Sequence, residues 1–416
     1  MEIDNLRNKI FNIKDKTFAT LSLGCRVNRA EIDKITSLLL RGCFNKTSYD
    51  KACLILINTC TVTHVADAKT RKLVRKVSSL NKKPNTIIIV SGCASEINQS
   101  VFKEIDKRIL VVPKKDLKEL FDNQDLDKQS FNDDLAAMRS NLKIQDGCNN
   151  NCSYCIVHVA RGKAISYDYK KVLTEFRGLL RSGVKEIVLT GINLASYRYK
   201  SIDLAKLCRE LVFLIDEYYQ NKKDDVPARI RLSSLEPQDI TQDFIQVLKS
   251  SNGKIARHLH LPLQSGSDKI LKLMNRKYTR SDYFKLIDDL KSNIPQIALS
   301  TDVIVGFPNE TEDDFSQTVD LCKKCGFMKI HVFPYSKRQG TPASTMSGQV
   351  GETVKQKRSL LLRDLSKDLQ VKDLDNRKGN VEYVFIEKPN IARTESYHLI
   401  NVKPQQKVGS LIRWRL

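Results

Sequence analysis

Six of the eleven cysteines in this chain have spacings that could support chemistry. Three of them lie in the run Cys148-Asn-Asn-Asn-Cys152-Ser-Tyr-Cys155, which is a C-x₃-C-x₂-C motif. Three thiolates at this spacing can hold three irons of a cubane cluster and leave the fourth iron open to a small molecule. A zinc site is a rival interpretation, but it needs a fourth ligand at short spacing, and His158 is the nearest candidate. Three core thiols meeting by chance is the third interpretation.

The other three cysteines of interest are far apart in the sequence but have the same local setting. Cys25, Cys60 and Cys93 each follow an apolar run, and they are 35 and 33 residues apart. If the three runs are adjacent parallel strands, the cysteines meet at one edge of a sheet. Each of them alone would be interpreted as a small core residue. The repeated placement favours a second three-cysteine cluster site.

The remaining cysteines and two histidines have simpler interpretations. A core role is expected for Cys43, Cys53, Cys208, Cys322 and Cys325, since three stand alone and the last two share a helical stretch without a redox-motif context. His258 and His260 alternate along a predicted strand and face the same side. Hydrogen bonding inside the domain is favoured for them over metal binding.

The composition indicates a globular protein with a polyanionic partner. The 416 residues include 70 Lys and Arg against 48 Asp and Glu, a formal net charge of +22, and 41% are hydrophobic. This excess favours nucleic acid as a partner, although a lysine-rich proteome is an alternative explanation. An odd number of cysteines, with no export signal, favours metal or redox chemistry over disulfides. No apolar run is long enough to span a bilayer, so we expect a soluble cytoplasmic protein without membrane contact.

Two basic segments are candidates for RNA contact. Lys69–Lys83 contains seven basic residues and no acid. The tail from Gly379 has six Lys and Arg against three Glu, interleaved with Tyr383, Phe385, Tyr397 and Trp414. Basic and aromatic side chains on a small β-fold are consistent with RNA binding through phosphate contacts and base stacking. A solvated helix face is the simpler interpretation of the first segment.

Alternating strand and helix signals predict an α/β protein with two sheet-based domains. In the first domain, strands are expected at Thr17–Leu23, Leu54–Ile57 and Thr86–Val90, with helices at Ala30–Leu40 and Lys69–Leu80 between them. This order implies a mostly parallel sheet with helices on its faces. The acidic segment Leu117–Asp134 is interpreted as a loop and linker.

A second alternation from about Lys143 gives six βα units, which suits an incomplete (β/α)₆ barrel. Its strands are expected at Leu142–Gln145, Glu186–Thr190, Arg229–Ser233, His258–Leu261, Ala298–Val305 and Lys329–Phe333. Its helices include Leu204–Ile215, Tyr283–Leu290 and Phe315–Lys324. A charged helix, Val354–Leu374, follows, and β signals at Val381–Ile386 and Ser410–Trp414 predict a small C-terminal β domain.

With these pieces assembled, the chain resembles the methylthiotransferases of the radical S-adenosylmethionine (SAM) superfamily over nearly its whole length. The triplet Cys148, Cys152 and Cys155 is the superfamily signature, and Cys25, Cys60 and Cys93 match the N-terminal cluster domain. Further matching runs are Leu189–Asn193, Arg231–Pro237, His258–Ser267, Thr301–Thr311 and His331–Ser336. The sequences Leu23–Asn28 and Asn58–Asp67 are similar to the MtaB branch, which acts on N6-threonylcarbamoyladenosine beside the tRNA anticodon.

The resemblance implies domain boundaries and cofactors. It places a methylthiotransferase domain at 15–125, a linker at 126–141, a radical SAM core at 142–376 and a short TRAM-like RNA-binding tail at 377–416. It implies two [4Fe–4S] clusters, on Cys25, Cys60 and Cys93 and on Cys148, Cys152 and Cys155. The residues that it implies for the SAM pocket are Tyr154, Gly191, Asn193, Glu236, Gln264 and Asp302.

The resemblance also implies a reaction and partners. The core cluster would chelate SAM and cleave it to a radical that takes hydrogen from carbon 2 of the modified adenine. The N-terminal cluster would supply or carry sulfur, and a second SAM would supply the methyl group. The tRNA anticodon stem-loop and an electron donor such as flavodoxin or ferredoxin are the implied partners, and no DNA is expected.

Three other functions remain open at this stage. One is methylthiolation of isopentenyladenosine in tRNA, and another is methylthiolation of an aspartate of a ribosomal protein. The third is non-enzymatic: an iron–sulfur protein that binds RNA or senses redox state.

Overall fold

The computed structural model describes residues 3–81, 83–121, 139–222 and 226–416. The chain divides into two units. The N-terminal unit comprises Met1–Phe131 and Cys155–Lys163, and the barrel unit comprises Asn132–Tyr154 and Ala164–Leu416. The chain therefore passes from the barrel unit into the N-terminal unit and back within the segment that follows Tyr154.

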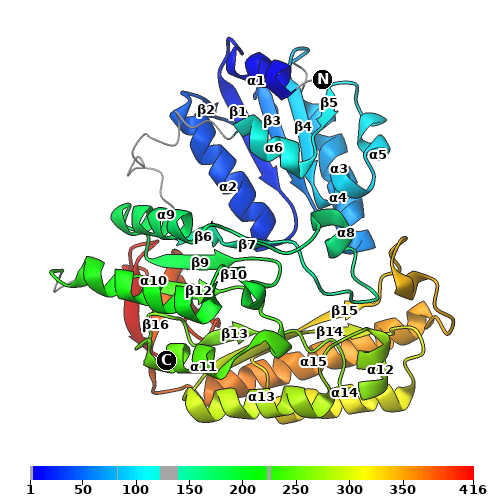
Figure 1. Ribbon diagram of the computed structural model, residues 1–416, viewed down its shortest axis with the longest axis vertical. Coiled ribbons are helices and arrows are strands. Elements are labelled where there is room, and N and C mark those ends of the chain that lie inside the picture. The colour runs from blue at the N-terminus through cyan, green and yellow to red at the C-terminus, as the bar shows by residue number, and fades with distance from the viewer. Residues whose placement is uncertain (1–2, 82, 122–138, 223–225) are drawn as a thin grey trace. The chain divides into compact units, whose positions relative to one another are not determined.

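The N-terminal unit is built on a parallel sheet of five strands in the order β2-β1-β3-β4-β5 (Figure 1). The strands are β1 (Thr17–Ser22), β2 (Asn45–Lys46), β3 (Leu54–Thr59), β4 (Ile87–Gly92) and β5 (Ile109–Val111). All residues of β3 and β4 are buried. Continuous apolar runs of this kind are what a parallel sheet needs when both of its faces are covered. The predicted parallel α/β sheet is confirmed.

Helices cover both faces of this sheet. The helices of the unit are α1 (Ile3–Phe11), α2 (Arg26–Arg41), α3 (His64–Leu80), α4 (Cys93–Ile97), α5 (Ser100–Lys103), α6 (Lys114–Phe121) and α8 (Val157–Arg161). One apolar cluster joins α1, α2 and α6 to the alternate strand residues Phe18, Leu54 and Leu56. A second cluster joins α3 to Ile55 and Ile57 on the opposite face.

The interpretation of Leu117–Asp134 as a loop was wrong at its start, because α6 extends to Phe121. Leu117, Leu120 and Phe121 are buried at helical spacing in the cluster that contains α1. The neighbouring acidic residues hid this short apolar stripe. Residues 122–138, which include most of the predicted linker, lie outside the described residues. The first strand of the next unit begins at Arg139, inside the end of the predicted linker.

The barrel unit contains six parallel strands. Strand pairing gives two groups, in the orders β6-β9-β12 and β13-β14-β15. A parallel bridge between Ser234, just after β12, and His260, in β13, connects the two groups. The strands are β6 (Arg139–Lys143), β9 (Glu186–Thr190), β12 (Arg229–Leu232), β13 (His258–His260), β14 (Ala298–Val305) and β15 (Lys329–Pro334). The predicted partial six-stranded barrel is confirmed.

Helices follow or separate these strands. They are α9 (Tyr169–Arg181), α10 (Leu204–Tyr219), α11 (Gln242–Ser250), α12 (Asp268–Leu273), α13 (Arg280–Asn293), α14 (Glu312–Cys325) and α15 (Glu352–Asp375). Two short antiparallel ribbons are β7 (Gln145–Asp146) with β8 (Ile165–Ser166) and β10 (Arg198–Tyr199) with β11 (Ile202–Asp203). A large apolar cluster lies between the strands and the helices. Among the described residues, none of the helices has the length and apolar composition required to cross a membrane.

The tail forms a four-stranded antiparallel sheet in the order β18-β17-β16-β19. Its strands are β16 (Val381–Lys388), β17 (Ile391–Thr394), β18 (Leu399–Asn401) and β19 (Leu411–Arg415). The small C-terminal β domain is therefore confirmed. The sequence signals identified only β16 and β19, because β17 and β18 are only four and three residues long.

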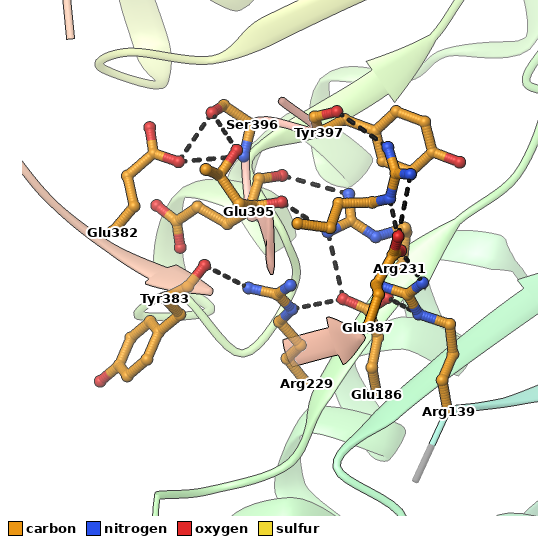
Figure 2. Close-up of polar contacts among 12 residues, drawn as sticks. Arg139, Glu186, Arg229, Arg231, Glu382, Tyr383, Glu387, Glu395, Ser396 and Tyr397 are labelled. Carbon is orange, nitrogen blue, oxygen red and sulfur yellow. Dashed lines mark hydrogen bonds and ion pairs between the residues drawn. The ribbon is translucent and has the colours of Figure 1, made fainter. Parts of the chain in front are cut away.

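Buried ion pairs and hydrogen bonds connect this sheet to the amino ends of the barrel strands (Figure 2). Glu186, the first residue of β9, has a fully buried side chain that accepts from Arg229 Nε at 2.6 Å and Arg231 Nη2 at 3.1 Å. Arg229 also donates to the Tyr383 carbonyl at 2.8 Å, and Arg231 donates to the Thr394 carbonyl at 3.1 Å. The sheet thus lies across the amino ends of β9 and β12.

Two tail aromatics contribute to this attachment. The Tyr397 ring lies 4.9 Å from the Arg231 guanidinium and stacks on His258 at 4.7 Å. Phe385 lies under Arg139 at 4.4 Å. Tyr397 and Phe385 therefore contact barrel residues. These two aromatic side chains are not available to stack on RNA bases, contrary to the prediction for the tail aromatics.

We expect Glu186→Gln to lower the free energy of unfolding by about 3–5 kcal/mol at pH 7, because it leaves buried arginines without their counter-ion. Burial opposes ionisation of Glu186, but Arg229, Arg231 and Arg139 outweigh it and hold its pKa well below the usual range. A lowered pKa contributes stability above the ordinary glutamate pKa, and this contribution is lost as pH falls through the folded-state value. Urea unfolding at pH 7 and at about pH 3, below the ordinary glutamate pKa, measures both effects.

Glu217→Gln, on the exposed face of α10, is the matched control and should change stability by less than about 0.5 kcal/mol. A Glu186→Gln protein as stable as this control would contradict the buried-ion interpretation.

Candidate functional site

The three dispersed cysteines lie at the carboxyl ends of three adjacent parallel strands. Cys25 is the N-cap of α2 after β1, Cys60 follows β3, and Cys93 begins α4 directly after β4. Burial raises the pKa of Cys60, and the nearby Cys93 and Cys25 raise it further. The three thiols are therefore within electrostatic range of one another, and Cys25 is exposed.

Two glycines with positive φ make room for this convergence. Gly24 has φ +105°, and a Cβ there would lie 2.7 Å from Cys60 Cβ and 3.0 Å from Cys60 Sγ. Gly92 has φ +103°, and a Cβ there would lie 2.2 Å from Asn58 Oδ1. Any larger residue at either place would be both strained and in collision.

Polar side chains around the thiols were not identified from the sequence. Asn28 Nδ2 donates to the carbonyls of Leu23 and Thr59, each at 2.8 Å, and so joins the loops that lead to Cys25 and Cys60. Arg161 Nε donates to Cys93 Sγ at 3.2 Å, and its guanidinium contacts Asn28 and forms a 3.0 Å ion pair with Glu31.

The pKa of Cys93 is raised overall, and the cations beside it oppose only part of this rise. Burial raises the pKa of Cys93, while the cations Arg161 and Lys114 act in the opposite direction. Three thiols at one edge of the sheet, with a cation beside Cys93, are compatible with an anionic metal cluster. No spacing rule connects Arg161 to Cys93, since 68 residues separate them.

The second set of cysteines lies on a loop that contacts the end of α12. Ser153 donates from its backbone N to the Met274 carbonyl at 3.1 Å and from Oγ to the Leu273 carbonyl at 2.7 Å. Burial raises the pKa of Cys148, and the nearby Cys152 and Glu236 raise it further. Cys148 and Cys152 belong to the barrel unit and Cys155 to the N-terminal unit, so the grouping of all three rests on their spacing.

A buried arginine also contacts this second set. Arg276 Nη1 donates to Cys152 Sγ at 3.3 Å and lies 3.5 Å from the Tyr154 hydroxyl, and its guanidinium forms an ion pair with Glu236. The Arg276 side chain is 3% exposed. The structure therefore brings the predicted residues Tyr154 and Glu236 close to Cys152, through an arginine that the sequence did not identify.

Gly191 and Asn193 lie at the carboxyl end of β9. Gln145 Oε1 accepts from the backbone N of Ile192 at 2.8 Å and of Asn193 at 3.0 Å, and a Cβ at Gly191 would collide with it at 2.8 Å. Asn193 Oδ1 accepts from the Glu236 backbone N at 3.4 Å. Gly191, Asn193 and Glu236 thus form one connected group.

Gln264 and Asp302 form a second group, on the other side of the strand row. The Gln264 backbone, with φ +66°, donates to the Asp302 carbonyl at 2.8 Å. His260 Nε2 lies 3.3 Å from Asp302 Oδ2, and His331 lies opposite Asp302 on β15. The ligand atoms of His260, Asp302 and His331 lie within 4.8 Å of one another. His258 and His260 both contact the Ser300 hydroxyl at 3.0 Å, as their shared face predicts.

The interpretation of the five remaining cysteines as core was correct for three of them. Cys208, Cys322 and Cys325 are buried in the barrel core. Cys43 is exposed in a turn with φ 62°, and Cys53 is half-buried beside Asp15 and Lys83, with Sγ 3.4 Å from Asp15 Oδ2. The sequence could not show that these two lie at the ends of elements.

Comparison with known proteins assigns the family. The model of the radical SAM superfamily matches residues 142–322, and that of the uncharacterized protein family UPF0004 matches residues 17–112. The chain is 38% identical over 376 residues to the threonylcarbamoyladenosine tRNA methylthiotransferase MtaB of Bacillus subtilis. This alignment covers 85% of this chain and 81% of that protein. The chain belongs to the radical SAM methylthiotransferase family. This methylthiotransferase is therefore an enzyme, and the non-enzymatic alternative is not supported.

Other comparisons agree with this assignment. The tRNA-2-methylthio-N(6)-dimethylallyladenosine synthase of Acetivibrio thermocellus is 34% identical over 446 residues, covering 99% of this chain and 91% of that protein. The solved radical SAM methyltransferase TsrM of Kitasatospora setae has a TM-score of 0.55 at 13% identity and covers 79% of this chain and 77% of that one. At this identity the similarity establishes the fold alone.

Membership of the radical SAM family implies one [4Fe–4S] cluster and SAM for this methylthiotransferase. The residues of the barrel unit fit these groups, because Cys148 and Cys152 lie beside a cation and a set of polar groups at the carboxyl ends of the strands.

The family resemblance implies a second cluster on Cys25, Cys60 and Cys93. If these cysteines hold it, we expect Gly24→Ala to remove that cluster, so that reconstituted protein loses about half of its iron. The new Cβ would meet Cys60 Cβ and Sγ, in addition to the strain of a positive φ. Gly183→Ala is the matched control, because Gly183 has φ +75° but no atom within 4 Å of the added Cβ. The control should lose about 1–2 kcal/mol of stability and keep its iron. Equal iron in the two variants would contradict the expected role of Gly24.

Proposed function

We propose that this methylthiotransferase adds a methylthio group to carbon 2 of N6-threonylcarbamoyladenosine beside the anticodon of tRNA. One SAM would supply the radical and a second SAM the methyl group. The observation that carries the proposal is the convergence of Cys25, Cys60 and Cys93 at one sheet edge, in a chain that also has the C-x₃-C-x₂-C motif. Two cluster sites are what a radical enzyme that also inserts sulfur requires.

The roles of the residues follow from their positions. Cys148, Cys152 and Cys155 would hold the cluster that, with SAM bound, supplies the radical chemistry. Tyr154, Gly191, Asn193 and Glu236 would form one side of the SAM pocket, and Gln264 and Asp302 the other. Cys25, Cys60 and Cys93 would hold a second [4Fe–4S] cluster that supplies or carries sulfur.

Each unit has exposed cations that are candidates for contact with the tRNA anticodon stem-loop. Lys69, Lys72, Arg75 and Lys76 are exposed on α3, which begins four residues after Cys60. Lys83 forms an ion pair with Asp15, and Lys82 lies outside the described residues. Arg413 and Arg415 are exposed on the tail sheet. We propose that these side chains contact phosphates, that the reaction takes place in the cytoplasm, and that flavodoxin or ferredoxin supplies electrons.

The choice of nucleoside rests on two short segments and on the relatives. The residues after Cys25 and Cys60 resemble the MtaB branch, and MtaB proteins of three further organisms are 32–35% identical to this chain. A dimethylallyladenosine synthase at 34% identity makes isopentenyladenosine the second candidate. A ribosomal-protein aspartate has no relative among these to support it.

We expect tRNA from cells that lack this gene to lose the methylthio form of threonylcarbamoyladenosine, because in this proposal the enzyme supplies its sulfur at carbon 2. Nucleoside mass spectrometry of deletion and complemented strains measures this loss. Complementation with Cys60→Ala should fail, and complementation with Cys208→Ala, at a buried thiol outside both sites, should restore the nucleoside.

Loss of a methylthio-isopentenyl nucleoside instead would assign the second candidate. An unchanged tRNA nucleoside profile would reject both tRNA substrates.

A further inference from the structure

Each cysteine set of this enzyme has one buried arginine whose guanidinium points at a cysteine sulfur. In the N-terminal unit, Arg161 has a side chain that is 1% exposed, and its Nε lies 3.2 Å from Cys93 Sγ. In the barrel unit, Arg276 has a side chain that is 3% exposed, and its Nη1 lies 3.3 Å from Cys152 Sγ. Both contacts are within hydrogen-bond range for a sulfur acceptor.

Each arginine is also balanced by one glutamate. Arg161 forms an ion pair with Glu31 at 3.0 Å, and Arg276 forms one with Glu236. The glutamate side chains are 18% and 16% exposed, so they are nearer to solvent than the arginines. Removing a guanidinium from water is costly unless its N–H groups find acceptors. In both units one of these acceptors is a cysteine sulfur, although an oxygen acceptor would serve packing equally well.

We propose that Arg161 and Arg276 are positioning residues that orient one cysteine sulfur of each site and raise the reduction potential of the iron–sulfur cluster held there. The inference rests on the proposed two-cluster function. Reduction adds one negative charge to a cluster, and a nearby cation that donates to a ligand sulfur stabilises that charge. The two arginines belong to different units, so each acts on its own site.

The arginine and its glutamate carry opposite charges, so removing each in turn should shift the reduction potential in opposite directions. Arg161→Gln removes the cation and should lower the potential of the N-terminal cluster. Glu31→Gln keeps Arg161 but removes the opposing charge, and it should raise that potential. A purely structural role of the Arg161–Glu31 pair would not produce shifts of opposite sign.

The experiment uses the full-length chain, reconstituted anaerobically with iron and sulfide, in two backgrounds. Substitution of Cys148, Cys152 and Cys155 by Ala leaves only the N-terminal cluster, and substitution of Cys25, Cys60 and Cys93 by Ala leaves only the core cluster. Potentials are measured by redox titration followed by electron paramagnetic resonance, and iron is counted in parallel. Arg29→Gln, at an exposed arginine of α2 with a side chain 65% exposed, is the matched control.

In the first background we expect Arg161→Gln to change the ratio of reduced to oxidised cluster about tenfold, a shift of about 59 mV to more negative values. Glu31→Gln should shift the potential to more positive values, and Arg276→Gln and Arg29→Gln should leave it unchanged. In the second background Arg276→Gln should lower the potential and Arg161→Gln should not.

Potentials that Arg161→Gln and Glu31→Gln leave unmoved, or move in the same direction, would overturn the inference for the N-terminal site. If Arg161→Gln fails to retain iron, the sign of the Glu31→Gln shift decides. An absence of iron in the whole first background would reject the two-cluster function instead, and the Arg276→Gln measurement would still test the inference at the core cluster.

Discussion

Parallel strand pairing is the constraint on which both sites of this enzyme depend. Parallel neighbours bring all their carboxyl ends to one edge, so residues from distant parts of the chain meet there. Cys25, Cys60 and Cys93 meet after β1, β3 and β4 for this reason. In the barrel unit the same constraint places Asn193, Glu236 and Gln264 after successive strands. The N-terminal cysteine set and the strand-end residues of the barrel unit therefore depend on the sheets, whereas Cys148, Cys152 and Cys155 form a local motif.

At the amino ends of the barrel strands, buried charged side chains contact the tail sheet. Glu186 pairs with Arg229 and Arg231, and the two arginines donate to carbonyls of the tail sheet, so the tail attaches through groups that are costly to bury alone. Buried polar groups need defined partners, so these contacts favour this arrangement of the sheet. It keeps the tail at the amino ends and the reactive groups at the carboxyl ends. The tail's exposed arginines, rather than Tyr397 and Phe385, are then its candidates for RNA contact.

Charge next to sulfur is common to the two cysteine sets. Arg161 and Arg276 occur in unrelated sequence surroundings, yet each contacts a cysteine and is balanced by a glutamate. A cluster with thiolate ligands carries net negative charge, and buried cations are an available means of stabilising it. The tenfold effects expected from such contacts are large enough to decide whether a weak electron donor can reduce a cluster.

The sequence by itself determined the α/β order, most strands to within one or two residues and the family, and it predicted both sets of cluster cysteines. Apolar runs and short motifs are local features of the chain, so they can be recognised without knowledge of the fold. Only the tertiary structure decided that Arg161 and Arg276 contact sulfur, that Gln145 supports Gly191, and that Phe385 and Tyr397 contact the barrel. It also showed that Leu117–Phe121 is helical and that Cys43 and Cys53 lie outside the core. These facts depend on contacts between residues far apart in the chain, whose partners no local spacing specifies.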